Sequence, residues 1–454
     1  MNKELWDLIL DFELDQIDEE YGFTIRLARE NYWTKEFTSL AILEYKKFMY
    51  MAATSDRMVS PSEVVDKVWH LHIVYTLSYQ KFCDLLGKNI QHIPSTHKRG
   101  EFKKFNLAKQ RTRDVYRSNF GEQPKNIWEN YDMFQSLNLI KSKHKLRTLI
   151  IVVIAIFIAL IIPFFLLLKP IIRTIGNPDF IIYLLVSTTI ILFSLELFNV
   201  RQLKKITRSF DKDSFIFKLS AFEVVYLKTQ NIASVIHGHI NQLFLKDYTY
   251  LKSGQIIGAN KKSRHTLNRE ELIIYEIANE DGSVNFASLI KALQNKPVFS
   301  NAQNCMNAFK KYFLKSKKFA TLFLINFTIL SSIIMVSFVR LSLGFMRGKP
   351  IGFILVLTAI LCFVMVFFLH RLTLQVCKET IPNIYKYELL TEDQKNNDWQ
   401  WSYFLVGTTA LSAGLATLVN YRDPRSSYSS TDSCSSCSSC SSCSSCGGCG
   451  GCGD

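Results

Sequence analysis

A short stretch near the N-terminus combines one carboxylate with imidazoles, the side chains that most often bind metal ions or transfer protons. Asp66 and His70 are four residues apart, and His92 follows after a predicted turn. Residues i and i+4 share one face of a helix, so we expect Asp66 and His70 to lie side by side, with His92 as a third member. The group is a candidate metal or acid–base site. The alternative is a hydrogen bond at the helix surface that fixes the tautomer of one histidine.

The helix that positions these residues is predicted over residues 60–87. Ser60 as N-cap, Pro61 at the first helical position and Glu63 as the third residue of the helix form a capping-box pattern. Gly87 is placed to end the helix. At about 100° per residue, the apolar side chains form one face. This face comprises Val65, Val68, Trp69, His72, Thr76, Tyr79, Cys83 and Leu86.

His72 has a different predicted role from His70. The two histidines are two residues apart, which places them about 160° apart around a helix, so they cannot easily share one ion. His72 lies on the predicted apolar face beside Trp69. We therefore expect His72 to be buried in the core of a helical domain.

A second set of candidate ligands closes the chain. The protein has 11 cysteines, and seven of them recur at every third position of a flexible tail rich in Ser and Gly. They are Cys434, Cys437, Cys440, Cys443, Cys446, Cys449 and Cys452. Overlapping CxxC units bring two thiolates around one soft ion, such as Zn²⁺ or Cu(I), if the chain turns between them. Thiol modification or cross-linking, and a biased tail without chemistry, are the two alternatives.

Uninterrupted apolar blocks predict that the chain crosses a membrane. The block from Leu149 to Leu168 is twenty residues long and uncharged, the length that crosses about 30 Å of hydrocarbon. Pro163 lacks a backbone N–H, and we expect it to kink this helix. Three more blocks are long enough to span: Phe180 to Val200, Phe319 to Val339 and Ile351 to Leu369.

Two further features belong to the membrane part. The block from Trp401 to Val419 is uncharged but rich in Gly, Thr, Ser and Ala. It is predicted either as a fifth span or as a helix that lies on or packs against the membrane part. Glu196 is the only carboxylate within the predicted spans, and its place near the end of the second span predicts pairing with Arg201.

The formal net charge of +15 is compatible with nucleic-acid binding, but its distribution argues against that function. Residues 201–318 hold 20 basic and 9 acidic side chains, and nine of the basic ones lie in clusters beside predicted spans. Such clusters mark the cytosolic ends of spans. Residues 1–146 and 201–318 are therefore predicted to be cytosolic. The expected partners are the lipid bilayer and other proteins, and nucleic acid is not expected.

The second predicted cytosolic domain contains a repeated pattern. Ser220 and Asn268 are placed as N-caps of two similar helix openings, each followed by a second short helix. Between them, Lys252-Ser253-Gly254 separates two short runs rich in Tyr and Ile, which predicts a hairpin. Helices followed by a small hairpin are typical of a winged-helix-like module. Three isolated histidines here have no acid or cysteine spaced to complete a site, so we expect solvated or structural roles: His237, His239 and His265.

Two stretches resemble known families. The run Val65-Asp66-Lys67-Val68-Trp69-His70, followed by Thr76, Tyr79, Phe82-Cys83, Leu86-Gly87, His92 and Pro94, resembles the helical domain of the glycine-rich domain-containing proteins, with their VDxxWHxH-type helix. Asp66, Trp69, His70 and His92 match that motif. This resemblance covers about residues 10–120 and implies an all-α domain rather than a particular reaction. Residues 140–454 are similar to an uncharacterised family of bacterial membrane proteins with Gly/Cys-rich tails, from which the chain departs by its Ser-Ser spacers and its additional N-terminal domain.

The predicted fold is therefore mainly α: a multi-pass α-helical membrane protein with an all-α N-terminal cytosolic domain and a winged-helix-like second cytosolic domain. The predicted parts are a helical domain (1–140), two spans (146–200), the second cytosolic domain (209–318), two more spans (319–369), a fifth span or interfacial helix (401–419) and a disordered tail (422–454).

The predicted function is that of a bacterial inner-membrane protein, with its N-terminus in the cytosol, that anchors helical domains for protein contacts. The alternative is a metal-binding or thiol-redox membrane protein that uses the CxxC tail. The sequence contains no GxSxG, HExxH, P-loop or strand-placed GxGxxG pattern. An enzyme centred on Asp66, His70 and His92 is a third hypothesis.

Overall fold

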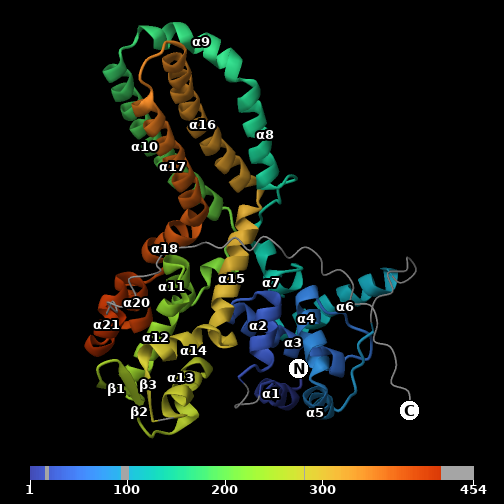
Figure 1. Cartoon of the computed structure of the whole chain (residues 1–454). Helices are drawn as coiled ribbons and strands as arrows, with labels where there is room; N and C mark the ends of the chain where they lie inside the picture. Colours follow the sequence, from blue (N-terminus) through green and yellow to red (C-terminus); the bar gives the residue numbers. More distant parts are fainter. Residues whose placement is uncertain (16–19, 94–101, 281, 421–454) are drawn as a thin grey trace, which may run out of the picture.

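The computed structural model describes residues 1–15, 20–93, 102–280 and 282–420. The seven tail cysteines, Cys434 to Cys452, lie outside the described residues, and so does Pro94. The described chain is mainly helical, with one small sheet. Figure 1 shows a bundle of long helices that rises from two groups of shorter helices.

The N-terminal domain consists of helices around an aromatic core. They are α1 (Lys3–Asp11), α2 (Phe23–Asn31), α3 (Lys35–Thr54), α4 (Glu63–Val74), α5 (Thr76–Leu86), α6 (Phe102–Phe120), α7 (Lys125–Trp128) and the 3-10 helix η2 (Met133–Leu137). Helix α3 is central, because it contacts α1, α2, α4 and α6. The core around it includes Tyr45 and Phe48.

Glu44 of α3 is a buried carboxylate with three partners. It accepts hydrogen bonds from the Tyr116 hydroxyl at 3.1 Å and from Trp128 Nε1 at 2.6 Å. Its third partner is Lys47, whose Nζ lies 2.7 Å from Glu44 Oε1. These bonds tie α6 and α7 to α3. They also satisfy a charge that would otherwise be costly to bury.

The prediction that Ser60 is the N-cap of the helix carrying Asp66 and His70 is wrong. Ser62, not Ser60, caps α4, because the Ser62 hydroxyl accepts a hydrogen bond from Val65 N at 3.2 Å. Ser60 is instead bonded through its backbone to the Thr112 hydroxyl of α6, which accepts from Ser60 N at 2.8 Å and donates to Ser60 O. This contact with α6 holds Ser60 outside the helix.

The single helix predicted over residues 60–87 is two helices. Tyr75, with φ −84° and ψ 64°, separates α4 from α5. Six residues of unbroken helix would turn through about 600°, which would place Ser78 on a different face from His72. The break instead brings Ser78 Oγ to 3.1 Å from His72 Nε2. Gly87, with φ +66°, ends α5 as predicted, and Thr76 is the one exposed member of the predicted apolar face.

Five helices form the long bundle. They are α8 (Leu146–Ala159), α9 (Ile161–Thr174), α10 (Asn177–Thr207), α16 (Lys317–Met346) and α17 (Gly352–Gln375). Helices α10 and α16, and α17 with its continuation to Leu389, are each long and apolar enough to cross a membrane. Helices α8 and α9 reach that length only together, as a pair bent by 53°. These helices suggest a membrane protein.

The bend in the first apolar block lies one turn before the predicted kink. The sequence predicts a kink at Pro163, whereas α8 ends at Ala159 and α9 begins at Ile161. Pro163 has no N–H to donate to the carbonyl of Ala159, and its ring crowds that carbonyl. The helix is therefore interrupted between the proline and the residue four positions before it.

The second helical domain combines five α-helices and two 3-10 helices with a three-stranded sheet. Its elements are η3 (Phe215–Phe217), α11 (Ala221–Thr229), α12 (Ile232–Leu245), β1 (Thr249–Ser253), β2 (Ile256–Ala259), η4 (Arg264–Thr266), α13 (Arg269–Glu280), β3 (Ser283–Asn285), α14 (Phe286–Gln294) and α15 (Pro297–Leu314). The hairpin β1–β2 turns at Gly254, which has φ +55°, and is confirmed. Strand β3 pairs with β2, so all three strands are antiparallel.

Both predicted helix openings of this domain are confirmed. The hydroxyl of Ser220 accepts from Glu223 N, and Glu223 Oε2 accepts from Ser220 N at 2.8 Å. In the second copy, Asn268 Oδ1 accepts from Glu271 N at 2.8 Å, and Glu271 Oε2 accepts from Asn268 N at 3.1 Å. Each pair is a reciprocal capping box.

The C-terminal helices return to the second domain. They are the π-helical turn η5 (Val376–Thr380), α18 (Ile381–Ile384), the π-helical turn η6 (Tyr385–Leu389), α19 (Glu392–Asn397), α20 (Trp399–Val406), η7 (Gly407–Ala410) and α21 (Ala413–Asn420). The block from Trp401 to Val419 is thus bent, by 61°, rather than straight. Tyr403 donates a hydrogen bond to Ser234 O at 2.8 Å, and Lys228 Nζ donates to Phe404 O at 2.8 Å. These bonds attach α20 to α11 and α12.

Two distant segments are joined where the domains meet the bundle. Ser142 N donates to Lys315 O at 2.9 Å, and Lys317 N donates to Ile140 O at 2.8 Å. The chain that leads into α8 is thereby paired with the short link between α15 and α16. Figure 1 shows α15 on the side of the second domain that faces the N-terminal domain, in line with the start of α16.

Candidate metal site and interdomain junction

The structure brings Asp66, His70 and His92 together. His92 Nε2 lies 2.9 Å from Asp66 Oδ1, and His70 Nε2 lies 3.4 Å from Asp66 Oδ2. The rings of His70 and His92 are 4.3 Å apart between centroids. One potential ligand atom from each residue lies within 4.8 Å of the other two. Two imidazoles and one carboxylate at this separation are a ligand set for a divalent transition-metal ion with further positions open to water.

His92 reaches this cluster because the chain after α5 folds back over α4. Trp69 Nε1 donates to the Tyr79 hydroxyl at 3.0 Å, and the Tyr79 hydroxyl donates to Ile90 O. The ring of Trp69 meets the His92 ring edge to face, at 4.6 Å between centroids. His92 is largely buried by these contacts, whereas 60% of the His70 side chain is exposed. The cluster is therefore held on one side and open to solvent on the other.

His72 is a buried core histidine, as predicted. Its Nδ1 lies 2.7 Å from the Tyr45 hydroxyl, so both ring nitrogens have a partner once Ser78 is counted. Burial lowers the pKa of His72 to about 4, so the ring is neutral at pH 7. His72 belongs to the packing of the domain and is not part of the cluster.

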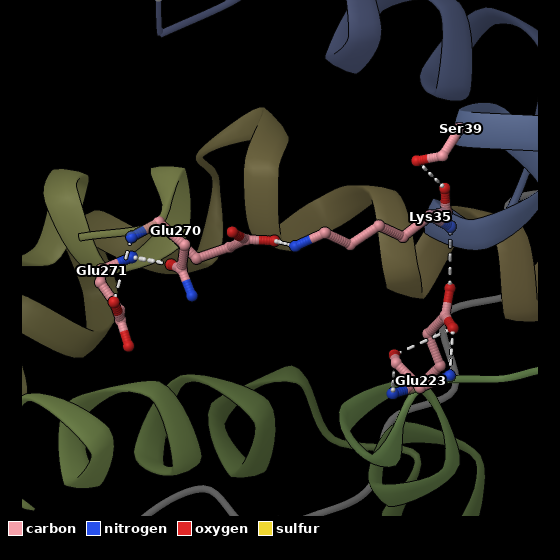
Figure 2. A network of polar contacts seen from close by, with 7 residues as sticks. Lys35, Ser39, Glu223, Glu270 and Glu271 are labelled. Atoms are coloured by element: carbon pink, nitrogen blue, oxygen red, sulfur yellow. Dashed lines mark hydrogen bonds and ion pairs between the residues drawn. The ribbon is translucent and has the colours of Figure 1, made fainter. Parts of the chain in front are cut away.

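Lys35 connects the two helical domains. Its Nζ lies 2.9 Å from Glu270 Oε1, and its backbone N donates to Glu223 Oε1 at 3.3 Å (Figure 2). Burial raises the pKa of Glu223. Burial also acts to raise the pKa of Glu270, but the charge and hydrogen bond of Lys35 together with the smaller contribution of His239 outweigh it, and the pKa lies below its usual value. One residue at the start of α3 thus contacts the first turns of both α11 and α13.

Further polar contacts lie along the same junction. Arg269 Nη1 lies 3.2 Å from Asp15 Oδ1, and Asn301 Nδ2 donates to Ile25 O at 3.2 Å. The contacts surround a cavity of about 330 Å³ between the domains, which His239 also lines. Burial lowers the pKa of His239 to about 4. The sequence did not indicate this junction, because its partners lie far apart in the chain.

The histidines predicted as isolated fall into two groups. His265 is exposed, in agreement with a solvated role. His237 is half-buried and its ring stacks on Phe286, at 5.5 Å between centroids. Burial lowers the pKa of His237 to about 4. His237 and His239 therefore have structural positions.

Glu196 of α10 has a different partner from the one predicted. Arg371 of α17 donates two hydrogen bonds to its carboxylate, at 2.8 and 2.9 Å, and Gln375 Nε2 donates a third at 2.8 Å. The predicted partner Arg201 lies on the same helix, whereas Arg371 makes a bidentate pair across two helices. Glu196 thus connects α10 to α17 at the end of the bundle near the helical domains.

Comparison with known proteins gives one family match to part of the chain and no activity. Residues 22–117, about a fifth of the chain, match the model of an uncharacterised family described as UCP032817-like. The matched part runs from α2 into α6 and contains Asp66, His70 and His92. No curated protein and no solved structure shows a significant match. The resemblance to the glycine-rich domain-containing proteins and the winged-helix-like architecture therefore stay predictions.

Proposed function

We propose that this protein is a membrane anchor that holds two helical domains together on the cytosolic side, where they bind other proteins. The single observation that carries this proposal is the surface of the long helices. In the most apolar stretches of α10 and α17, only 22% and 11% of the residues are buried inside the protein. Phe353 and Phe363 of α17 are 87% and 73% exposed. Apolar surface of this extent requires lipid or another protein to cover it.

The charges at the ends of the bundle support the orientation. Lys141, Lys143 and Lys145 precede α8, and a second basic cluster, which includes Lys315 and Lys318, lies at the start of α16. The pairing of residues 140–142 with residues 315–317 places both clusters at the end of the bundle that faces the helical domains. Basic residues favour the cytosolic side of a span.

Alkaline carbonate extraction of cell membranes tests the anchor. We expect the protein to stay in the membrane pellet, and release into the supernatant would contradict the proposal. Labelling of intact cells with a membrane-impermeant maleimide then tests the side of the tail. Because α20 packs against α11 and α12, we expect the tail cysteines to be protected until the cells are lysed. Labelling in intact cells would require the block from Trp401 to Val419 to cross the membrane.

A second candidate function is the binding of a divalent metal ion by Asp66, His70 and His92. The observation that favours it is that one ligand atom from each residue lies within 4.8 Å of the others. An ion such as Zn²⁺ would displace the hydrogen bonds between these side chains and keep a position for water. The test is metal analysis of the full-length protein and of a form that lacks residues 426–454. Metal in both forms supports this site, metal in the full-length protein alone points to the tail, and metal in neither form contradicts both.

A further inference from the structure

The end of the bundle farthest from the helical domains contains a cavity with an unusual charge. The cavity has a volume of about 540 Å³ and lies between the start of α10, the end of α16 and the start of α17. Three of its lining residues are basic, and none is acidic: Arg340, Arg347 and Lys349. Asp179, in the first turn of α10, is the nearby acid, and it is not part of the lining. The site therefore has an excess of positive charge.

The three basic side chains have different roles. Arg340 is already engaged: it donates to Ile172 O at 2.7 Å and to Asn177 Oδ1 at 2.6 Å. Its guanidinium also lies 4.9 Å from the centroid of the Phe180 ring. It thus fixes the walls of the cavity. Arg347 and Lys349 are exposed, and within the described parts of the chain their side chains have no hydrogen bond or ion pair. These two cations are available to a ligand.

A tight turn holds these two cations next to each other. Arg347 N and Lys349 N both donate to Gly344 O, at 3.2 and 3.0 Å, and Gly348 between them has φ +62°. This conformation ends α16 and folds the chain back into α17. The backbone that carries Arg347 and Lys349 is therefore fixed, and a bound anion would need to order only the side chains.

Apolar side chains surround the charged turn. Phe345, Met346 and Phe353 are 76%, 67% and 87% exposed. A soluble anion gains nothing from such a rim, whereas a molecule with a charged head and apolar chains contacts both surfaces. With the bundle in a membrane, this rim would lie where the apolar helices leave the hydrocarbon. At that level, phosphodiesters of lipids are the abundant anions.

In the proposed orientation the far end is the end that crosses the membrane, where basic residues are less common. Basic residues in short loops oppose transfer of those loops across the membrane. The far end of the bundle nevertheless carries five basic residues: Lys169, Arg173, Arg340, Arg347 and Lys349. A ligand that compensates the charge accounts for basic residues at this end.

We propose that this cavity binds the phosphate headgroup of one anionic phospholipid, with Arg347 and Lys349 as its ligands. Arginine pairs with phosphate through two N–H groups, and lysine supplies a compact charge beside it. The acyl chains would follow the exposed apolar face of α17. This inference rests on the proposed function, because it requires the bundle to lie in a membrane.

The test uses the full-length protein, purified in mild detergent with an equimolar mixture of phosphatidylglycerol and phosphatidylcholine, and native mass spectrometry. We expect the wild type to retain phosphatidylglycerol selectively. The double variant Arg347→Gln/Lys349→Gln should lose about tenfold or more of this retention, because two charge-assisted hydrogen bonds are removed. The control Lys169→Gln/Arg173→Gln removes the same charge from α9, outside the cavity, and should bind as the wild type does.

The possible results separate this inference from the anchor itself. Equal retention of both lipids by the wild type, or unchanged retention by the double variant, would overturn the lipid site. Displacement of the lipid by millimolar inorganic phosphate would show a site for free phosphate and would also overturn it. The single variants Arg347→Gln and Lys349→Gln should give intermediate retention of phosphatidylglycerol. They replace the double variant in this test if the double variant does not fold. Carbonate extraction of the same proteins reports on the anchor independently.

Discussion

His92 Nε2 lies 2.9 Å from Asp66 Oδ1, although 26 residues and a helix break separate the two side chains along the chain. The contact joins the segment after α5 to the first turn of α4. It leaves His70, one helical turn from Asp66, on the solvent side of the same carboxylate.

Removal of His92 should weaken metal binding at the cluster. In protein that lacks residues 426–454, we expect about one equivalent of bound Zn²⁺ and at least a tenfold weaker affinity in His92→Ala, because one of three protein ligands is lost. Metal analysis and competition with a chromogenic chelator measure both quantities. His265→Ala removes an exposed histidine elsewhere and should bind as the parent does. Equal Zn²⁺ affinity of His92→Ala and His265→Ala would show that Asp66 and His92 form a hydrogen bond and do not bind the ion.

The Lys35–Glu270 pair should stabilise docking of the two domains. Lys35→Ala leaves the largely buried Glu270 carboxylate without its cation. Because 66% of the Lys35 side chain is exposed, we expect a loss of only about 1 kcal/mol, seen as faster hydrogen exchange at the starts of α3 and α13. Lys262→Ala breaks an ion pair within the second domain and should not change exchange at the start of α3. Unchanged hydrogen exchange in Lys35→Ala would show that the Lys35–Glu270 pair does not stabilise docking.

The buried His72 should make the N-terminal domain less stable in acid. Its pKa is about 4 in the folded protein and about 6.5 when exposed, so the unfolded chain binds the proton first. Stability is therefore complete above about pH 6.5 and falls as the pH falls toward 4, by roughly 3 kcal/mol at most. Pulse proteolysis in urea, with detection of peptides from α3 to α5, measures this slope.

Two variants test whether His72 causes this dependence of stability on pH. His72→Gln should flatten the dependence on pH while lowering stability overall, because the amide replaces only part of the bonding to Tyr45 and Ser78. His265→Gln changes an exposed ring and should keep the slope of the wild type. A slope that survives in His72→Gln would have to come from other groups.

Glu44 should be required for the packing of α6 and α7. Glu44→Ala leaves Trp128 Nε1 and the Tyr116 hydroxyl without their acceptor. We expect a loss of about 2–3 kcal/mol and a decrease of several degrees in the melting temperature of the domain. Glu30→Ala removes a half-exposed carboxylate paired with Arg26 on the surface and should cost less than about 0.5 kcal/mol. Similar melting temperatures for the two variants would contradict this role.

Local patterns predicted the local parts of the structure. The caps at Ser220 and Asn268, the end of a helix at Gly87 and the burial of His72 follow from the spacing of a few residues. Ser60 shows where such patterns stop. It has Glu63 three residues later and matches a capping box, whereas Ser62, the cap that the structure uses, is followed by Val65 at that position. A bond between Ser60 and Thr112 on another helix accompanies this difference, and the sequence pattern does not contain it.

Contacts between distant residues could not be predicted in the same way. Arg201 is the nearest basic residue after Glu196, but Arg371 reaches the carboxylate because two helices pack side by side. Lys35 and Glu270 are 235 residues apart, and neither belongs to a pattern that indicates a partner. For His92, the sequence indicated a suitable side chain, while the bond between Tyr79 and Ile90 brings it to the cluster.

The junction between the two helical domains cannot form early in biosynthesis, because its two sides lie far apart in the chain. A ribosome completes the N-terminal domain first. Glu270 and Asn301 are translated more than two hundred residues after their partners Lys35 and Ile25, and only after α8, α9 and α10. The face of the N-terminal domain that contacts the second domain is therefore uncovered while those helices are synthesised. The two domains can dock only after α15 has been synthesised. An assembled junction therefore marks a molecule in which α8, α9 and α10 have already been made.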